Sequence, residues 1–188
     1  SISELYIPDK DFIFFLGNTD PKKNTDNVLR AYAEYVSSAT EKPLPLLIAD
    51  LKREIVDSIL LKYNLSNVID LVYTPGYINN NHLPYIYSAA KIFLYPSLRE
   101  SFGIPILESM ACGTPVITSK RSAMPEIAGV NAILINPDDH YTIAEEICKL
   151  LNDSDYYTSK VEYGLERAKH FSWKNAAERL KSIYESME

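Results

Sequence analysis

The apolar residues of this chain gather in two kinds of segment that alternate along it. Short, continuously apolar runs predict strands, and stretches in which apolar residues recur every three or four positions predict helices. The predicted strands are 12–16, 44–49, 68–73, 92–95, 115–118 and 132–135. The predicted helices lie within 28–36, 55–60, 83–90, 106–112, 143–151, 157–169 and 173–187.

Strands that are apolar on both faces and alternate with helices are typical of a parallel sheet covered on both sides. We therefore expect an α/β domain with a doubly wound parallel sheet of about six strands. Ligands of such sheets bind beyond the carboxyl ends of the strands. The candidate loops are those after Leu16, Tyr73, Tyr95, Thr118 and Ile135.

The composition fits an ordinary globular domain, with 188 residues, 46% apolar and 23% charged. No apolar run reaches the ~18 residues of a membrane span, and SISELYIPDK lacks the pattern of a signal peptide. The net charge of −6 argues against a nucleic-acid surface. Two distant cysteines, Cys112 and Cys148, make no disulfide framework. We expect both to be buried free thiols, in a cytoplasmic protein.

Several familiar sites are missing from the sequence. The six glycines are too far apart for a dinucleotide-binding or Walker loop, and the three histidines show no metal-ligand spacing. We therefore expect no metal site. The strings at 9–11 and 153–155 have the form Asp-x-Asp. We interpret them as helix caps or solvated turns, with metal–diphosphate binding as the lesser alternative.

The segment 95–116 is the most informative stretch for chemistry. A predicted strand ends at Tyr95, and a helix begins near Pro105, a residue suited to a first helical turn. The free amides of Phe102, Gly103 and Ile104, with the helix dipole, predict an anion site fitted to a phosphate. Gly103 would let another group approach the backbone closely.

Two carboxylates, Glu100 and Glu108, frame this site with seven residues between them. Such separated acceptors suit a ligand with hydroxyls at both ends and phosphates between. The simpler alternative is an exposed loop glutamate and a glutamate in the first helical turn that favours the dipole.

The text around these two glutamates, PSLRESFGIPILESMACGTPV, resembles the signature of retaining GT-B glycosyltransferases of family 4, the group 1 glycosyl transferases. Further segments resemble the same family along nearly the whole chain. They are FFLGNTDPKKNTDNVLRAY, PGYINNNHLPYIYSAAKIFLYPS, ITSKRSAMPEIAG, AILINPDD and FSWKNAAERLKSIY. The resemblance implies that residues 1–188 are a single carboxyl-terminal, nucleotide-sugar-binding domain. It would be Rossmann-like, one half of a GT-B fold, with residues 171–188 as its terminal crossing helix.

The resemblance also implies roles for individual residues. Glu100 would contact sugar hydroxyls and is the candidate catalytic residue, and Glu108 would contact the ribose. The amides of Phe102 and Gly103 would face the donor, and Lys23 would bind the diphosphate; the alternative for Lys23 is an ordinary solvated lysine. The full predicted donor-binding set is Gly17, Asn18, Lys23, Glu100, Ser101, Phe102, Gly103, Ile104 and Glu108, with Tyr77 and Ile78 at the base.

One departure concerns Asn18, since many family members carry an arginine directly after the first glycine. Phosphate binding could then depend on Lys23, on the helix amides, or on Lys120 or Arg121. Alternatively, the chain belongs to a mannosyltransferase-like branch with a different set. Glu126 matches an acidic position of the family.

The local alternative for Glu126 is that it caps the short turn that begins at Ser122.

The resulting functional expectation is the donor-binding domain of a retaining hexosyltransferase. The donor would be a UDP- or GDP-linked sugar, the acceptor a glycan or lipid, and no cofactor is required. The acceptor would bind through an amino-terminal domain that this chain lacks, so the chain alone should be inactive. Nucleic acid is not an expected partner, and peripheral membrane association of the full-length enzyme is left open. The alternatives are a non-catalytic nucleotide-sugar-binding or interaction module, and half of a sugar-nucleotide epimerase.

The last predicted helix has its own expectation. Ser172 is its predicted N-cap, and Trp173, Leu180 and Tyr184 recur at helical spacing. Without a partner domain, part of its apolar face should be exposed or covered by a neighbouring copy. The alternative is that it packs on its own domain.

Overall fold

Six parallel strands form the centre of the structure, a computed structural model that describes residues 1–187. The strands lie in the order β3-β2-β1-β4-β5-β6, and each neighbouring pair runs parallel. Their bounds are β1 Ile13–Leu16, β2 Leu46–Ala49, β3 Val72–Gly76, β4 Ile92–Tyr95, β5 Val116–Ser119 and β6 Ile133–Ile135. This sheet confirms the predicted doubly wound α/β class.

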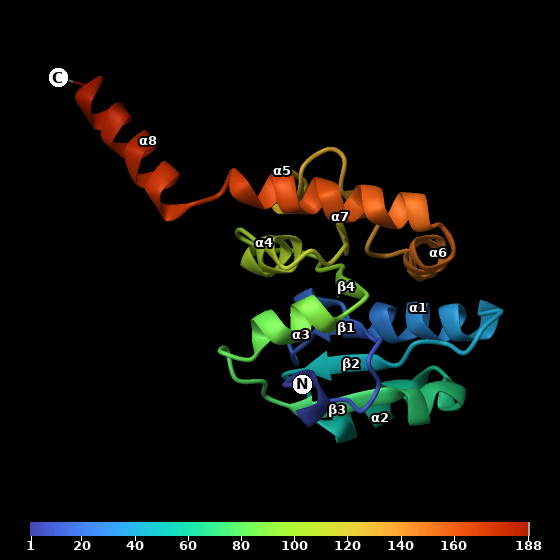
Figure 1. Ribbon diagram of the computed structural model, residues 1–188. Helices are drawn as coiled ribbons and strands as arrows, with labels where there is room; N and C mark the ends of the chain where they lie inside the picture. The colour runs from blue at the N-terminus through green and yellow to red at the C-terminus, as the bar shows by residue number, and fades with distance from the viewer. Residues whose placement is uncertain (188) are drawn as a thin grey trace.

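Helices cover both faces of the sheet (Figure 1). The helices α1, α2 and α6 pack on one face, and α3, α4, α5 and α7 pack on the other. Their bounds are α1 Thr25–Ser38, α2 Arg53–Lys62, α3 Leu83–Ala89, α4 Ile104–Ala111, α5 Met124–Ala128, α6 His140–Asn152, α7 Ser154–Lys169 and α8 Trp173–Glu185. The described residues also form three short 3₁₀ helices: η1 Ser3–Leu5, η2 Pro21–Lys23 and η3 Ser66–Leu71. In the described part of the chain, none of the helices combines the length and the hydrophobicity that crossing a bilayer requires.

The continuously apolar strands follow from this layering. Alternate side chains of a strand point to opposite faces, so Ile13 and Phe15 enter the core beneath α1, whereas Phe12 and Phe14 enter the core beneath α3 and α4. All four side chains are at most 1% exposed. Both faces of each central strand therefore need apolar residues, so these strands do not alternate between apolar and polar residues.

Two local predictions were wrong. The segment 68–73 was expected to be a strand ended by Pro75, but residues 66–71 form η3 and the strand is β3, Val72–Gly76. β3 tolerates Pro75 because it is an edge strand whose register with β2 shifts between Leu47 and Ala49, next to the proline. The five-residue helix α5 was not predicted as a helix, since it is too short to show a helical period.

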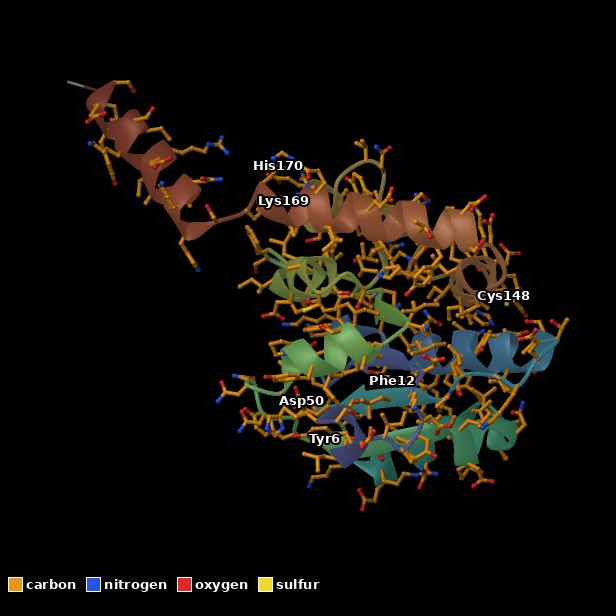
Figure 2. The ribbon with its side chains drawn as sticks, in the orientation of Figure 1. Tyr6, Phe12, Asp50, Cys148, Lys169 and His170 are labelled. Atoms are coloured by element: carbon orange, nitrogen blue, oxygen red, sulfur yellow. The ribbon has the colours of Figure 1, made fainter. Side chains whose placement is uncertain are left out.

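The predicted helix cap at Asp153 is confirmed, whereas the prediction for the two cysteines is only partly right. Asp153 caps α7 by accepting a hydrogen bond from the amide of Tyr156 at 2.8 Å, as expected. Both cysteines are free thiols, but the expectation that they are buried was wrong, because each is only half-buried. Cys112 is the C-cap residue of α4. Cys148 lies within α6, with its sulfur 3.5 Å from the Ser38 hydroxyl (Figure 2).

The helix α8 leaves the body of the domain at the end of α7, where Lys169 and His170 mark the turn (Figures 1 and 2). Ser172 caps it as predicted, accepting from the amide of Asn175 at 3.0 Å. Trp173 is 89% exposed, and the apolar side chains further along α8 are exposed as well. The expectation that part of its apolar face lies open is confirmed, and packing of this helix on its own domain was wrong.

Candidate functional site

The candidate site lies at the carboxyl ends of β1 and β4, which are neighbours in the sheet. From β1 the chain proceeds to β2 on one side, and from β4 it proceeds to β5 on the other. Such a reversal of strand order leaves a crevice between the diverging loops, where ligands of open α/β sheets bind. Lys23 comes from the loop after β1, and Glu100 comes from the loop after β4.

Hydrogen bonds to backbone carbonyls join the two loops. Asn24 has a left-handed backbone with φ of 64°, and its side-chain amide donates to the carbonyls of Pro96 at 3.0 Å and Pro137 at 2.6 Å. The amide of Leu98 donates to the carbonyl of Lys22 at 2.7 Å. These bonds hold η2 against the start of the β4 loop, so the side chains of the two loops meet at a defined place.

Lys23 and Glu100 form an ion pair at this junction. The ammonium Nζ lies 2.7 Å from Glu100 Oε1, and the two side chains are only 12% and 14% exposed. The same Nζ donates to the hydroxyl of Tyr95 at 3.1 Å and lies 4.7 Å from the centre of its ring. Lys23 is therefore not the solvated lysine of the simpler interpretation.

The ion pair keeps Glu100 charged. Burial by itself would raise the pKa of this carboxyl, but the hydrogen bond and charge of Lys23, with the hydroxyls of Tyr95 and Ser97, lower the pKa below its ordinary value of 4.5. Burial raises the pKa of Tyr95, and the charge of Glu100 adds to this effect. At neutral pH the site therefore contains a cation, an anion and a neutral phenol.

The amino end of α4 follows this cluster directly. Gly103 is the N-cap residue with φ of 97°, a conformation that favours glycine, and Pro105 lies in the first turn. The first amides of a helix have no partner inside it, so they can face a bound anion. Ser101, Phe102 and Ile104 are exposed here, as a ligand contact requires. Phe102 also contacts Phe171 edge-on, with ring centres 6.2 Å apart.

Glu108 lies further along α4 and is exposed. Its carboxylate accepts a hydrogen bond from the hydroxyl of Tyr87 at 3.1 Å. Tyr87 is fully buried on α3, and burial followed by the charge of Glu108 raises its pKa. The phenol is therefore a fixed neutral donor to one oxygen, while the rest of the carboxylate faces solvent.

Gly17 and Asn18 have local structural contacts. A side chain at Gly17 would approach Phe15 at 3.0 Å and Ile48 at 3.3 Å, which explains the glycine by packing. The side-chain oxygen of Asn18 accepts from the amide of Asp20 at 2.9 Å. Within residues 1–187, Asn18 lines a hollow of about 460 Å³ that Lys23 does not line. The donor-binding roles of Gly17 and Asn18 stay predictions.

The predicted base contacts lie at the edge of the sheet. Tyr77 follows β3 and is 69% exposed, whereas Ile78 is buried. Because β3 is separated from β1 by β2, these residues lie on the opposite side of the β1 loop from Glu100. Their contact with a base stays a prediction.

The loop after β5 supports the site. The hydroxyl of Ser122, whose backbone is left-handed with φ of 55°, donates to the carbonyl of Glu100 at 2.7 Å. The alternative that Glu126 caps a turn beginning at Ser122 was wrong, because α5 starts after Ala123 without a side-chain cap. Arg121, one candidate substitute for the missing arginine, is paired with Asp138.

Two further positions of that region complete the picture. Glu126 is exposed in the first turn of α5, where its charge favours the helix dipole. Lys120 is exposed, and its backbone amide donates to Ile135 at 2.9 Å.

The sequence interpretation missed four supporting residues: Tyr87, Tyr95, Asn24 and Ser122. Tyr95 carried a signal, since it is the one polar-tipped side chain of the run Ile92–Tyr95 and it ends the strand next to the predicted site. The other three carried no local signal, because each acts on a residue distant in sequence. Among residues 1–187, no group of three or more His, Cys, Asp or Glu side chains is arranged to hold a metal ion.

Comparison with known families agrees with this geometry. Residues 3–167 match the family model described as Glycosyl transferases group 1. The chain therefore belongs to the group 1 glycosyl transferase family, and the recognition made from its motifs is confirmed.

Individual relatives place the chain as part of longer proteins. It is 31% identical over 173 residues to O-antigen chain mannosyltransferase B of Escherichia coli, covering 92% of this chain and 45% of that protein. It thus spans less than half of this relative. The solved C-terminal domain of a group 1 glycosyl transferase from Francisella tularensis is 25% identical, with a TM-score of 0.74 and 87% of each chain covered.

An Anabaena protein solved in complex with UDP-glucose has the same fold. It superposes with a TM-score of 0.79 at 18% identity, covering 98% of this chain and 52% of that one. Together these matches show a GT-B type domain.

Proposed function

We propose that this domain binds the nucleotide-diphosphate sugar of a retaining hexosyltransferase. The observation that carries the proposal is the Lys23–Glu100 pair, 2.7 Å apart, beside the amino end of α4. It places a cation and free amides for phosphates next to a carboxylate for hydroxyls. The mannosyltransferase relative and the UDP-glucose complex of the Anabaena protein support a sugar nucleotide as the ligand.

In this proposal the site residues divide the donor among them. Lys23 and the first amides of α4 bind the diphosphate, Glu100 binds sugar hydroxyls, and Glu108 binds the ribose. Charge that develops on the leaving diphosphate would be stabilised by groups already in place, which is electrostatic preorganisation. The donor is UDP- or GDP-linked and is bound without a metal or other cofactor, in the cytoplasm.

The acceptor, a glycan or lipid, would bind to a second domain outside this chain. Transfer requires donor and acceptor to be oriented and shielded from water, and orientation can contribute ~7–11 kcal/mol. A single domain cannot both orient the two substrates and shield them from water. We therefore expect no sugar transfer by these 188 residues with any nucleotide sugar and acceptor. Turnover at a rate typical of an enzyme would contradict the half-enzyme proposal.

The direct test is calorimetric titration with UDP, GDP and ADP, each in the presence of EDTA. Binding of one nucleotide without metal is the expected result, and no binding of any would contradict the proposal. Glu108→Ala should weaken the bare nucleotide, whereas Glu100→Ala should mainly weaken the nucleotide sugar. Equal losses for both ligands in both variants would contradict this division of roles.

A further inference from the structure

Tyr95 occupies an unusual place for a buried aromatic residue. It is the last residue of β4, in the middle of the sheet, and is only 1% exposed. Its ring stacks on that of Phe93 with centres 5.7 Å apart, and Phe93 in turn contacts Tyr87 at 5.1 Å. The phenol oxygen is therefore positioned by the sheet and the core rather than by a loop.

The hydroxyl of Tyr95 meets a cation at this point. Lys23 Nζ donates to it at 3.1 Å, above a ring whose centre is 4.7 Å away. An ammonium carries three protons. One goes to Glu100 Oε1 and one to Tyr95, and no hydrogen bond within residues 1–187 uses the third.

We propose that Tyr95 is a positioning residue for the donor: its hydroxyl and ring hold the Lys23 ammonium so that the third proton is offered to a diphosphate oxygen. Lys23 then keeps its pair with Glu100 when the donor binds, and the sugar and phosphate contacts stay in register. This inference rests on the proposed function, because it assigns Tyr95 a part in the same site.

The physical reason is the flexibility of lysine. Its four-carbon stem gives the ammonium many positions, and fixing it costs conformational entropy. Glu100 alone leaves Nζ free to turn about the carboxylate. Adding the phenol oxygen and the ring face as second and third contacts defines one position before the ligand arrives. The conformational entropy of the Lys23 side chain is then lost when the free domain folds, and not when the ligand binds.

Tyr32 provides a matched control. It is also a fully buried tyrosine, but its hydroxyl donates to the carbonyl of Leu44 at 3.0 Å on the opposite face of the sheet. Tyr95→Phe and Tyr32→Phe each remove one buried hydroxyl and keep the ring. A purely structural role for Tyr95 predicts the same behaviour for both variants.

The test has two readouts on the 188-residue chain, with folding checked by circular dichroism. The first is the affinity for UDP and GDP by calorimetry. Tyr95→Phe should lower the affinity about fivefold, the equivalent of one ordinary hydrogen bond, and Tyr32→Phe should leave it unchanged. The second is the ¹H–¹⁵N NMR signal of the Lys23 ammonium without ligand. We expect this signal in the wild type and in Tyr32→Phe, and its loss through fast exchange in Tyr95→Phe.

The outcomes separate this inference from the proposed function. A wild type that binds no nucleotide contradicts the proposed function, and the ammonium signal then still decides whether Tyr95 holds Lys23. A wild type that binds, with Tyr95→Phe binding equally well, overturns the role of Tyr95. An unchanged Lys23 signal in Tyr95→Phe overturns it as well.

Discussion

Glu100 and Glu108 are the same residue type on one continuous segment, and the fold gives them contrasting surroundings. Glu100 is 14% exposed and paired with Lys23 from a loop 77 positions away in sequence. Glu108 is exposed and held at one oxygen by Tyr87. The difference indicates that contacts within the domain hold Glu100, whereas most of the Glu108 carboxylate faces solvent. Glu108 is bonded to Tyr87, and Glu100 shares the Lys23 ammonium with Tyr95; the rings of both buried tyrosines contact Phe93.

The largest expected contrast is in stability. Lys23→Met leaves the Glu100 carboxylate without its cation in a mostly buried place, so it should lower the free energy of unfolding by about 3 kcal/mol. Glu108→Gln keeps the size of an exposed side chain and should change this free energy by less than about 0.5 kcal/mol. Urea denaturation of both variants measures the contrast, and equal losses would remove it.

The second contrast concerns pH. The pKa of Glu100 is lower in the folded protein than its ordinary value of 4.5. Its contribution to stability is therefore fully present above about pH 5 and is lost as the pH falls through the folded pKa, below 4.5. Glu100→Gln should thus be less stable than the wild type at pH 7, with a difference that shrinks toward pH 3.

The same series in a Lys23→Met background is the control for this pH effect. Without the cation, Glu100→Gln should no longer reduce stability at pH 7. Thermal unfolding between pH 3 and pH 7 measures both series. A difference that did not shrink at all as the pH falls below 4.5 would show that the carboxylate charge is not its source.

Gly103 connects the loop that contains Glu100 to the helix that contains Glu108, because it is the N-cap residue of α4. Gly103→Ala places a side chain at φ of 97° and 3.1 Å from the Ile106 methyl, so it should cost about 1–2 kcal/mol. Because this strain would displace the Glu100 loop relative to the start of α4, the affinities for nucleotide and for nucleotide sugar should both fall. Gly113→Ala, which also places a side chain at a positive φ, 77°, but beyond the opposite end of α4, is the control, and urea denaturation with calorimetry measures both effects.

The smallest expected effect belongs to Tyr87→Phe. It removes one hydrogen bond to a carboxylate that can turn to water, so the loss of stability should be about 1 kcal/mol or less. Tyr157→Phe, which loses a bond of 3.1 Å to the Lys91 carbonyl, is the comparison variant. If Tyr87→Phe cost as much as Lys23→Met in urea denaturation, the two glutamates would be held equally firmly.

The sequence by itself determined the class of fold and the framework of the site. A sheet between two helix layers requires apolar residues on both strand faces. These apolar runs predicted all six strands, with bounds that differ by more than two residues only at β3. The loop that ends in Gly103 and the helix that begins at Ile104 were readable because glycine and proline act locally on the backbone. The amphipathic pattern of α8 predicted a helix for the same local reason.

Only the tertiary structure decided which side chains meet. Lys23, Tyr95 and Glu100 come together because β1 and β4 are neighbours in the sheet, and that adjacency depends on packing across the whole domain. Tertiary packing also brought Arg121 to Asp138. The spacing of residues along the chain cannot predict such contacts. Their energy comes from burial and charge between residues that become neighbours only when the chain folds.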